Sequence, residues 1–198
     1  MSGEQRDPFE LAAFLDHAYE SWLARLSAEE TAAITAWQGT NRHYDKVQSA
    51  FRSQEAEVPR GIRAEVRNLR TAIRSAQLPI DLQTWKGIRS VSRVFGVTVS
   101  SLLPGTVARY RGFFAVTADR AVATPEFTHP PGPASAAVLQ MTWRAGSNLA
   151  WIAGAGQRDL RSQYELLAAP GISLRVLAVT YPAGAANVPE ISVEVSTS

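Results

Sequence analysis

The segment SQYELLAAPG, residues 162–171, places polar residues directly before an apolar run that ends at a Pro-Gly turn. This pattern predicts a polar loop that leads into a short buried strand. Gln163 and Glu165 are two residues apart, so in an extended chain their side chains point to the same face. Glu165 is therefore a candidate for chemistry at the start of the strand, and a strand-edge surface carboxylate is the alternative interpretation. For Gln163, the alternative is a polar side chain that fills the junction between loop and strand.

Two further segments precede this one in the chain, LQTWKG at 82–87 and GFFAVT at 112–117. In order and in setting, the three segments resemble the signature blocks of the mono-ADP-ribosyltransferase exoenzyme family, whose members include toxins. That family has Arg-Gly on one strand, Ser-Thr-Ser on a second, and Glu/Gln-x-Glu just before a long last strand. Here Lys86 replaces the arginine, and Ala-Val-Thr at 115–117 replaces the three hydroxyl-bearing residues. The resemblance covers nearly the whole chain.

The resemblance implies an enzyme that breaks the bond between nicotinamide and ribose in NAD and passes ADP-ribose to an acceptor. The transition state has oxocarbenium character, which a fixed carboxylate beside the ribose stabilises. We assign this catalytic role to Glu165. In the family, the position of Gln163 faces the acceptor, and a glutamine there accompanies asparagine or nucleobase modification. A glutamine offers a donor and an acceptor but no general base for a guanidinium, which disfavours an arginine acceptor.

The resemblance also assigns residues to the NAD site. Lys86 takes the place of the arginine that clamps the diphosphate, and it keeps the charge but loses the planar fork. That replacement costs on the order of 1–3 kcal/mol if nothing substitutes for the lost hydrogen bonds. Arg89 and Arg120 are candidates to compensate, and the backbone of Gly87 would receive the nicotinamide carboxamide. An ordinary strand-edge cation is the alternative interpretation of Lys86.

Thr117 carries the one hydroxyl that remains in the second block. In the family, the first serine orients the catalytic glutamate; Ala115 cannot, which leaves Thr117 to hold Glu165 in place. A β-branched residue at this position is also what any buried strand would contain. Phe127 lies in the proline-rich stretch 123–136 and is a candidate to stack against nicotinamide. The alternative is that Phe127 pins this stretch to the core.

Composition argues against several other kinds of site. The chain has no cysteine, and its three histidines are scattered without ligand spacing, so we expect neither a thiolate nor a metal site. A formal charge of +2 is too small to indicate a nucleic-acid or membrane partner by bulk electrostatics. The first ten residues contain no apolar leader, and no apolar run approaches the length of a membrane span. We therefore expect a protein that is cytoplasmic in its producer or is delivered by a route without a cleavable signal.

Helical patterns occupy the first part of the chain. Apolar residues at helical intervals predict four helices, at about 9–26, 27–39, 44–51 and 60–76. Ser27 and Glu30 have the spacing of a capping box at the start of the second helix. The fourth predicted helix has arginines along one side, at Arg63, Arg67, Arg70 and Arg74. We interpret this side as a solvated face, and a landing surface for phosphates or an acidic partner is the alternative.

Strand patterns occupy the second part of the chain. Alternation predicts strands at 137–143, 172–178 and 190–195, with loops at 123–136 and 154–162. Helices followed by strands favour an α+β fold over an alternating one. A single domain is expected at 9–198 after a flexible N-terminus at 1–8, with helices at about 9–76 and a β-rich core at about 82–196. The resemblance implies that this core is two roughly perpendicular antiparallel or mixed sheets, with the NAD cleft between them.

Three functions are consistent with these features. The first is a mono-ADP-ribosyltransferase, a toxin or effector, that uses NAD to modify a macromolecule: a protein side chain or, as second choice, a nucleobase. The second is a degenerate member that keeps the fold as a binding module, for which Lys86 and Ala115 argue. The third is an NAD glycohydrolase, in which water is the acceptor. The sequence does not identify the acceptor, an immunity protein or a chaperone.

Overall fold

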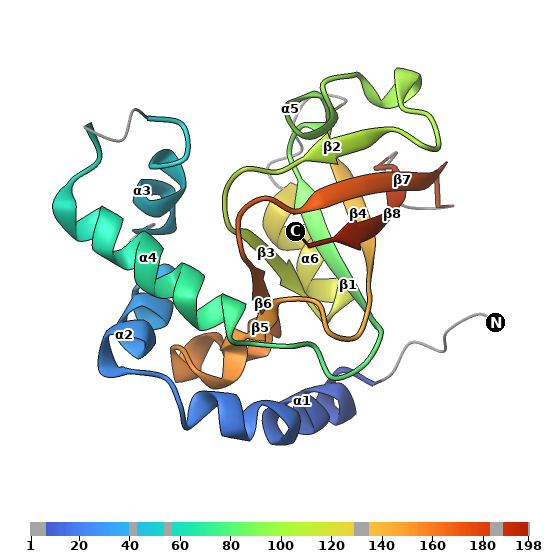
Figure 1. The fold of residues 1–198 in the computed structure, drawn as a ribbon. Coiled ribbons are helices and arrows are strands. Elements are labelled where there is room, and N and C mark those ends of the chain that lie inside the picture. The colour runs from blue at the N-terminus through green and yellow to red at the C-terminus, as the bar shows by residue number, and fades with distance from the viewer. Residues whose placement is uncertain (1–6, 40–42, 54–56, 129–134, 183–187, 198) are drawn as a thin grey trace.

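The computed structural model describes residues 7–39, 43–53, 57–128, 135–182 and 188–197. Helices come first and strands second, and the described strands form one mixed sheet (Figure 1). The predicted α+β class is therefore confirmed. Among the described residues, no helix combines the length and the apolarity needed to cross a membrane.

Four helices make up the first part: α1 (Pro8–Leu23), α2 (Ala28–Trp37), α3 (His43–Ser49) and α4 (Arg60–Arg74). Asp7 caps α1 by accepting a hydrogen bond from the amide of Phe9 at 2.7 Å. The predicted capping box of α2 is present, because Ser27 and Glu30 each accept a hydrogen bond from the other's backbone amide. These caps fix the starts of α1 and α2.

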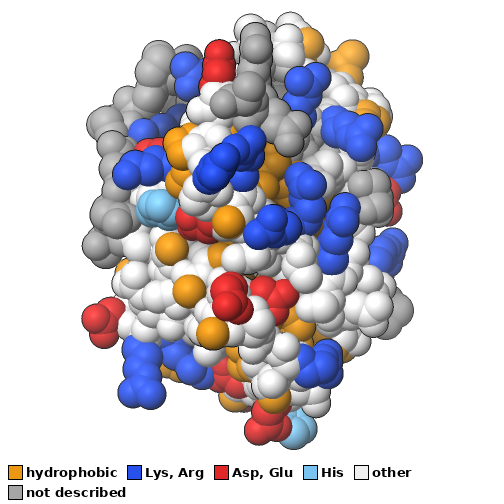
Figure 2. Space-filling model, turned by 60° about the vertical axis from the view of Figure 1, so that its left-hand side comes forward, with side chains coloured by type: hydrophobic (Ala, Val, Ile, Leu, Met, Phe, Trp, Pro, Cys, Tyr) orange, Lys and Arg blue, Asp and Glu red, His pale blue; other side chains and the backbone are white. Residues whose placement is uncertain are grey.

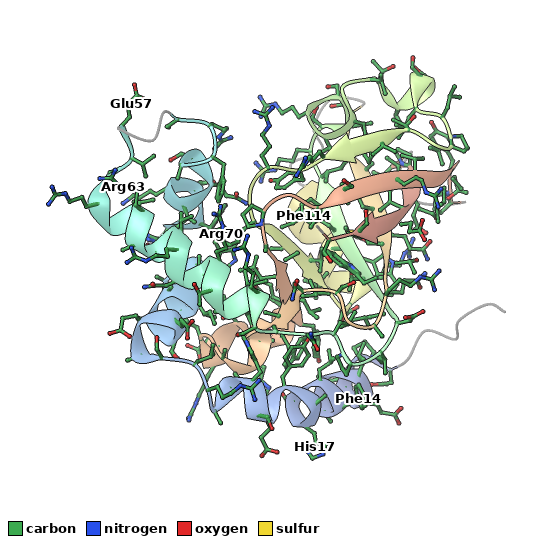
Figure 3. The ribbon with its side chains drawn as sticks, viewed as in Figure 1. Phe14, His17, Glu57, Arg63, Arg70 and Phe114 are labelled. Atoms are coloured by element: carbon green, nitrogen blue, oxygen red, sulfur yellow. The ribbon has the colours of Figure 1, made fainter. Side chains whose placement is uncertain are left out.

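The arginine face of α4 is largely exposed. Arg63 projects from α4 away from the rest of the protein (Figure 3). On the side of the molecule that carries the helices, Lys and Arg side chains are spread over much of the surface, with acidic side chains between them (Figure 2). This distribution agrees with the interpretation of a solvated face.

Eight strands form the sheet, in the order β2-β7-β8-β4-β1-β3-β6-β5. Their bounds are β1 (Leu82–Ile88), β2 (Val107–Arg109), β3 (Phe114–Thr117), β4 (Ala137–Trp143), β5 (Leu149–Trp151), β6 (Glu165–Ala168), β7 (Ser173–Thr180) and β8 (Glu190–Ser196). All neighbours are antiparallel except β4 and β8, which run parallel. The three strands predicted by alternation coincide closely with β4, β7 and β8.

The central contact between β1 and β3 is narrow. These strands pair at a single position, Trp85 with Thr117, whereas β1 pairs with β4 along its whole length from Leu82 to Ile88. The sheet therefore has a five-stranded section, β2-β7-β8-β4-β1, and a three-stranded section, β3-β6-β5, which meet at one pair. The two sheets expected from the resemblance correspond to these sections, which hydrogen bonding joins into one sheet.

One predicted loop is wrong. The stretch 123–136, which was expected to be a loop because of its prolines, begins inside the helix α6 (Arg120–Thr128). Asp119 starts this helix by accepting a hydrogen bond from the amide of Ala121 at 2.8 Å. Pro125 therefore lies within a helix, although proline usually disfavours a helix interior. The prolines at 130, 131 and 133 lie outside the described residues.

Short helical turns also occur where the sequence predicted a loop or no regular element. The predicted loop 154–162 is mostly 3₁₀ structure, with η3 (Ile152–Gly154) and η4 (Arg158–Gln163). A short helix, α5 (Val91–Phe95), and a 3₁₀ turn, η2 (Val99–Ser101), follow β1 and were not predicted. They are too short to give a periodic apolar pattern, so a sequence reading based on periodicity does not detect them.

The core joins the helical layer to the sheet. Tyr19 on α1 donates its hydroxyl to the backbone carbonyl of Leu149 on β5, and Trp143 on β4 donates to Thr84 on β1 at 2.8 Å. Trp22 on α1 donates to the backbone carbonyl of Ala72 on α4 at 3.0 Å. Each of these groups is buried, and each polar atom has a partner. The helices are thus fixed against β5 and β6, which positions α2 beside the start of β6.

Candidate active site

Glu165 is the first residue of β6 and pairs with Thr117 at the end of β3. Both residues line a cavity of about 30 Å³ at the place where the two sections of the sheet meet. Its other lining residues are Trp85, Lys86, Ala115, Val116, Val122 and Gln163. The structure therefore brings all three sequence segments that carried the resemblance to one cavity.

Gln163 reaches this cavity by a route that the sequence did not predict. It ends the η4 turn rather than lying in an extended strand, and Tyr164 after it has a left-handed backbone with φ 48°. The expectation that Gln163 and Glu165 share one face of a strand is therefore wrong in its geometry. Tyr164 instead turns the chain sharply between them, and its ring contacts Phe9 edge-on at 6.2 Å. A left-handed residue other than glycine costs about 1–2 kcal/mol, so this turn is held by its surroundings.

The carboxylate of Glu165 is held by two donors from the helical layer. The indole N–H of Trp37 donates to Oε1 at 3.1 Å, and the side-chain amide of Gln38 donates to Oε2 at 2.9 Å. Trp37 ends α2, and Gln38 is its C-cap residue. Sequence analysis counted this helix as packing and did not identify either residue. A glutamine that follows a core tryptophan at a helix end was the available signal, because buried polar groups need partners.

Lys86 lies opposite, on β1. Its Nζ donates to the backbone carbonyl of Ala115 at 2.7 Å and lies 4.9 Å from the centre of the Phe114 ring. Removal from water lowers the pKa of Lys86 to about 8, and the Glu165 carboxylate opposes part of that decrease. Lys86 thus ties β1 to β3 beside the single backbone pair that joins these strands.

The hydroxyl of Thr117 forms a hydrogen bond with the backbone of the segment before β6. It donates to the backbone carbonyl of Gln163 at 2.7 Å and accepts from the amide of Asp119 at 3.0 Å. A hydroxyl has one proton, and here that proton is used on Gln163. Thr117 therefore positions the backbone on which Gln163 and Glu165 stand, whereas the expectation was a bond to the Glu165 side chain.

The other predicted residues differ in how they relate to the cavity. Gly87 is buried within β1 and pairs with Val138. Arg89 is exposed just after β1, and Arg120 donates twice to one oxygen of Glu190, at 2.8 and 3.0 Å. Neither arginine lines the cavity, so the structure does not place them as replacements for an arginine at Lys86.

Two further expectations concern Phe127 and metals. Phe127 belongs to α6, but its side chain lies outside the described residues, so its proposed stacking role stays a prediction. Within the described ranges, no group of three or more His, Asp or Glu side chains is placed to hold a metal ion.

A second hollow is lined mainly by residues of α2. It is open and has a volume of about 680 Å³, and its lining includes Ala32, Ala36, His43 and Gln157. Its walls are mostly small or apolar and carry no carboxylate. The smaller cavity at Glu165 is therefore the better candidate for an active site, because it combines a fixed carboxylate, a cation and an amide.

Comparison with known proteins gives one consistent result. No family model matches the sequence, and no curated protein matches it. Solved structures do match. The toxin Plx2a from Paenibacillus larvae, described as an ADP-ribosyltransferase, has a TM-score of 0.78 and 14% identity, covering 98% of this chain and 99% of that chain.

Two C3 proteins are similar to the same degree. The C3 exoenzyme of Clostridium limosum has a TM-score of 0.77 and 14% identity over 100% of this chain and 98% of its own. The C3stau2 protein of S. aureus, solved with NAD, has a TM-score of 0.76 and 15% identity over 98% and 99%. At such identities the likeness establishes a shared fold, and it extends over the full length of the chain. The resemblance inferred from three short segments is thus confirmed at the level of the fold.

Proposed function

We propose that this chain, which has the fold of the mono-ADP-ribosyltransferase toxins, transfers ADP-ribose from NAD to a macromolecular acceptor. It would act as a toxin or effector. Glu165 would be the catalytic carboxylate, and the side chain of Gln163 would face the acceptor. The observation that carries the proposal is the fixed Glu165 side chain. Two donors hold its two oxygens, and it lies in the cavity that also contains Lys86 and Gln163.

The chemistry would be a substitution at the anomeric carbon of the ribose attached to nicotinamide. The bond between that carbon and the nicotinamide nitrogen breaks, and its electron pair leaves with nicotinamide. The carboxylate of Glu165 stabilises the positive charge that develops on the ribose. The acceptor nucleophile then bonds to the same carbon and releases its proton to solvent or to a neighbouring base.

The residues at the cavity suit the chemical groups of NAD. Lys86 supplies a cation for the diphosphate, and Glu165 supplies an acceptor for a ribose hydroxyl. The indole N–H of Trp85, another lining residue, is buried and has no hydrogen-bond partner among the described residues. The polar groups required for recognition are therefore available around this cavity.

The cavity is too small to hold NAD in the conformation seen here. Small-molecule sites have volumes of about 300–1,000 Å³, whereas this cavity has about 30 Å³. Binding of NAD therefore requires this cavity to widen.

A second candidate function rests on that same observation. The small volume of the cavity, the bond from Lys86 to the Ala115 carbonyl, and an alanine at the position of the orienting serine favour a fold retained for binding without turnover. An NAD glycohydrolase, in which water takes the place of the acceptor, is the remaining alternative. Gln163→Ala separates it from a transferase, because a transferase would lose acceptor labelling while NAD cleavage continues.

The decisive experiment is nicotinamide release from NAD by the purified protein, at concentrations above the ordinary KM limit of about 1 mM. We expect Glu165→Gln to lower release at least about 100-fold, because it removes the charge that stabilises the transition state. Glu194→Gln is a matched control, since Glu194 lies on β8 and pairs with Arg175. Equal release by the wild type and Glu165→Gln would contradict the proposal. No release by the wild type would favour the binding module.

A further inference from the structure

We propose that Trp37 and Gln38, at the end of α2, are the positioning residues that hold Glu165 in its catalytic orientation. This inference rests on the proposed function and adds two residues to its machinery. In the exoenzyme family that the sequence resembles, a serine on the second signature strand does this work. In this chain, residues of the helical layer orient the glutamate instead of a residue on that strand.

The strand β3 has no side chain left for this task. Ala115 has only a methyl group at the position of the orienting serine. Thr117, two residues later, donates its single hydroxyl proton to the backbone carbonyl of Gln163. The orientation of the Glu165 side chain must therefore be set from elsewhere, and α2 supplies two donors for it.

The two donors fix the carboxylate in a specific way. Trp37 bonds one oxygen and Gln38 bonds the other, at 3.1 and 2.9 Å. A donor on each oxygen sets the plane of the carboxylate and restricts its rotation. A carboxylate oxygen can accept more than one hydrogen bond, so these donors are compatible with a further bond from a ribose hydroxyl.

Both donors are rigid. Trp37 is buried, and its ring packs edge-on against Phe113 at 5.6 Å, just before β3. Gln38 is buried, and its amide oxygen accepts from the backbone amide of Gln157 at 3.0 Å. Because Gln157 offers a proton, the oxygen of Gln38 faces Gln157 and its NH₂ faces Glu165. Donors fixed before the reaction stabilise a transition state without a cost of reorganisation.

Gly156 makes this arrangement depend on the loop that leads to η4. A Cβ atom added at Gly156 would lie 1.5 Å from Oε1 and 2.6 Å from Cδ of Gln38. Any larger residue at 156 must therefore displace the Gln38 amide. Gln38 thus connects the catalytic carboxylate to the start of the segment that ends at Gln163.

The first test is kinetic. We expect Gln38→Ala and Trp37→Phe each to lower kcat for nicotinamide release about 10- to 100-fold, with KM for NAD changed less than about 2-fold, because misplacement of a catalytic group affects the chemical step. Trp22→Phe is the matched control: it also removes a buried indole donor, which bonds the carbonyl of Ala72 and the hydroxyl of Ser75 rather than Glu165. We expect it to lower thermal stability and leave kcat unchanged. Unchanged kcat in folded Gln38→Ala and Trp37→Phe would overturn the inference.

The second test uses Gly156→Ala, which alters neither donor. In the wild type we expect it to lower kcat as much as Gln38→Ala does. In the Gln38→Ala background, where the displaced amide no longer exists, it should have almost no further effect on kcat. Additive losses would contradict the coupling between Gly156 and Gln38.

A third measurement does not depend on turnover. The indole N–H resonance of Trp37, identified by its loss in Trp37→Phe, should exchange slowly with solvent and should shift in Glu165→Gln. The Trp22 indole resonance should not respond. No response of the Trp37 resonance would overturn the inference whatever the activity. A clear response without nicotinamide release by the wild type would instead reject the proposed function and leave the contact established.

Discussion

The two sides of the cavity are built very differently. On the carboxylate side, Glu165 is held by Trp37 and Gln38, and Gln38 is held in turn by Gln157. On the cation side, Lys86 donates to the carbonyl of Ala115 and lies beside the Phe114 ring. The first side joins three segments that are distant in sequence, whereas the second side is formed by two neighbouring strands.

This difference indicates which side must move. Several mutually dependent hydrogen bonds keep Glu165 in one orientation, so the carboxylate side acts as a fixed reference. The cation side has one backbone pair between β1 and β3 and a lysine whose pKa is lowered by removal from water. We therefore expect the cavity to open by movement of Lys86 and its wall, and the predictions below test this asymmetry.

Among the predictions that test this asymmetry, the largest effect concerns NAD affinity. Lys86 is the cation among the lining residues, so Lys86→Met should raise KM for NAD about 10- to 100-fold through the loss of a charged hydrogen bond of about 1.5–3 kcal/mol. Steady-state nicotinamide release measures it. Arg89→Met is the matched control, and because Arg89 is exposed and does not line the cavity, we expect KM to change less than about 2-fold. Equal effects of the two variants would mean that the cation side is not centred on Lys86.

Thr117 lies where the two sides meet. Thr117→Val should lower the free energy of unfolding by about 2–3 kcal/mol, because it leaves the Gln163 carbonyl and the Asp119 amide without their partner. It should also lower nicotinamide release. Thr84→Val, which removes the acceptor of Trp143 within the core, is the control and should affect stability alone. Chemical denaturation and release assays on both variants decide whether Thr117 supports the site.

The pH dependence of stability is the third expectation. The pKa of Lys86 is lowered from 10.5 to about 8 in the folded protein, so the unfolded chain binds more protons between these two values. Stability should therefore rise with pH from about 8 to 10.5, relative to Lys86→Met, by about 1–3 kcal/mol. Denaturation of both proteins across this range isolates Lys86 from the tyrosines. A constant difference would mean that the lysine is well solvated and the cation side is already open.

The smallest expected effect concerns the turn before Glu165. Tyr164 has a left-handed backbone, so Tyr164→Gly should be more stable than Tyr164→Ala by about 1 kcal/mol, although both lose the ring contact with Phe9. Thermal unfolding of the two variants gives the difference. If alanine were equal or better, the turn would relax without its side chain, and the carboxylate side would be less rigid than described.

Much of the fold could be predicted from local patterns. The capping box at Ser27 and Glu30 and the alternating strands β4, β7 and β8 follow from rules that act over a few residues. The helix α6 was missed because the prolines of the stretch 123–136 outweighed the N-cap at Asp119. Gln163 and Glu165 do meet at one cavity, but through the left-handed Tyr164, which no alternation pattern contains.

By itself, the sequence predicted the order of helices and strands and singled out the three segments that line one cavity, Glu165 among them. Only the tertiary structure decided what holds Glu165. Trp37 and Gln38 are 128 and 127 residues away from it in the chain, and their donors reach it because α2 packs beside the start of β6. Local propensities act over a few residues, whereas such a contact depends on how whole layers pack. The same holds for Lys86. The sequence shows its charge, but its bond to Ala115 depends on how β1 packs against β3.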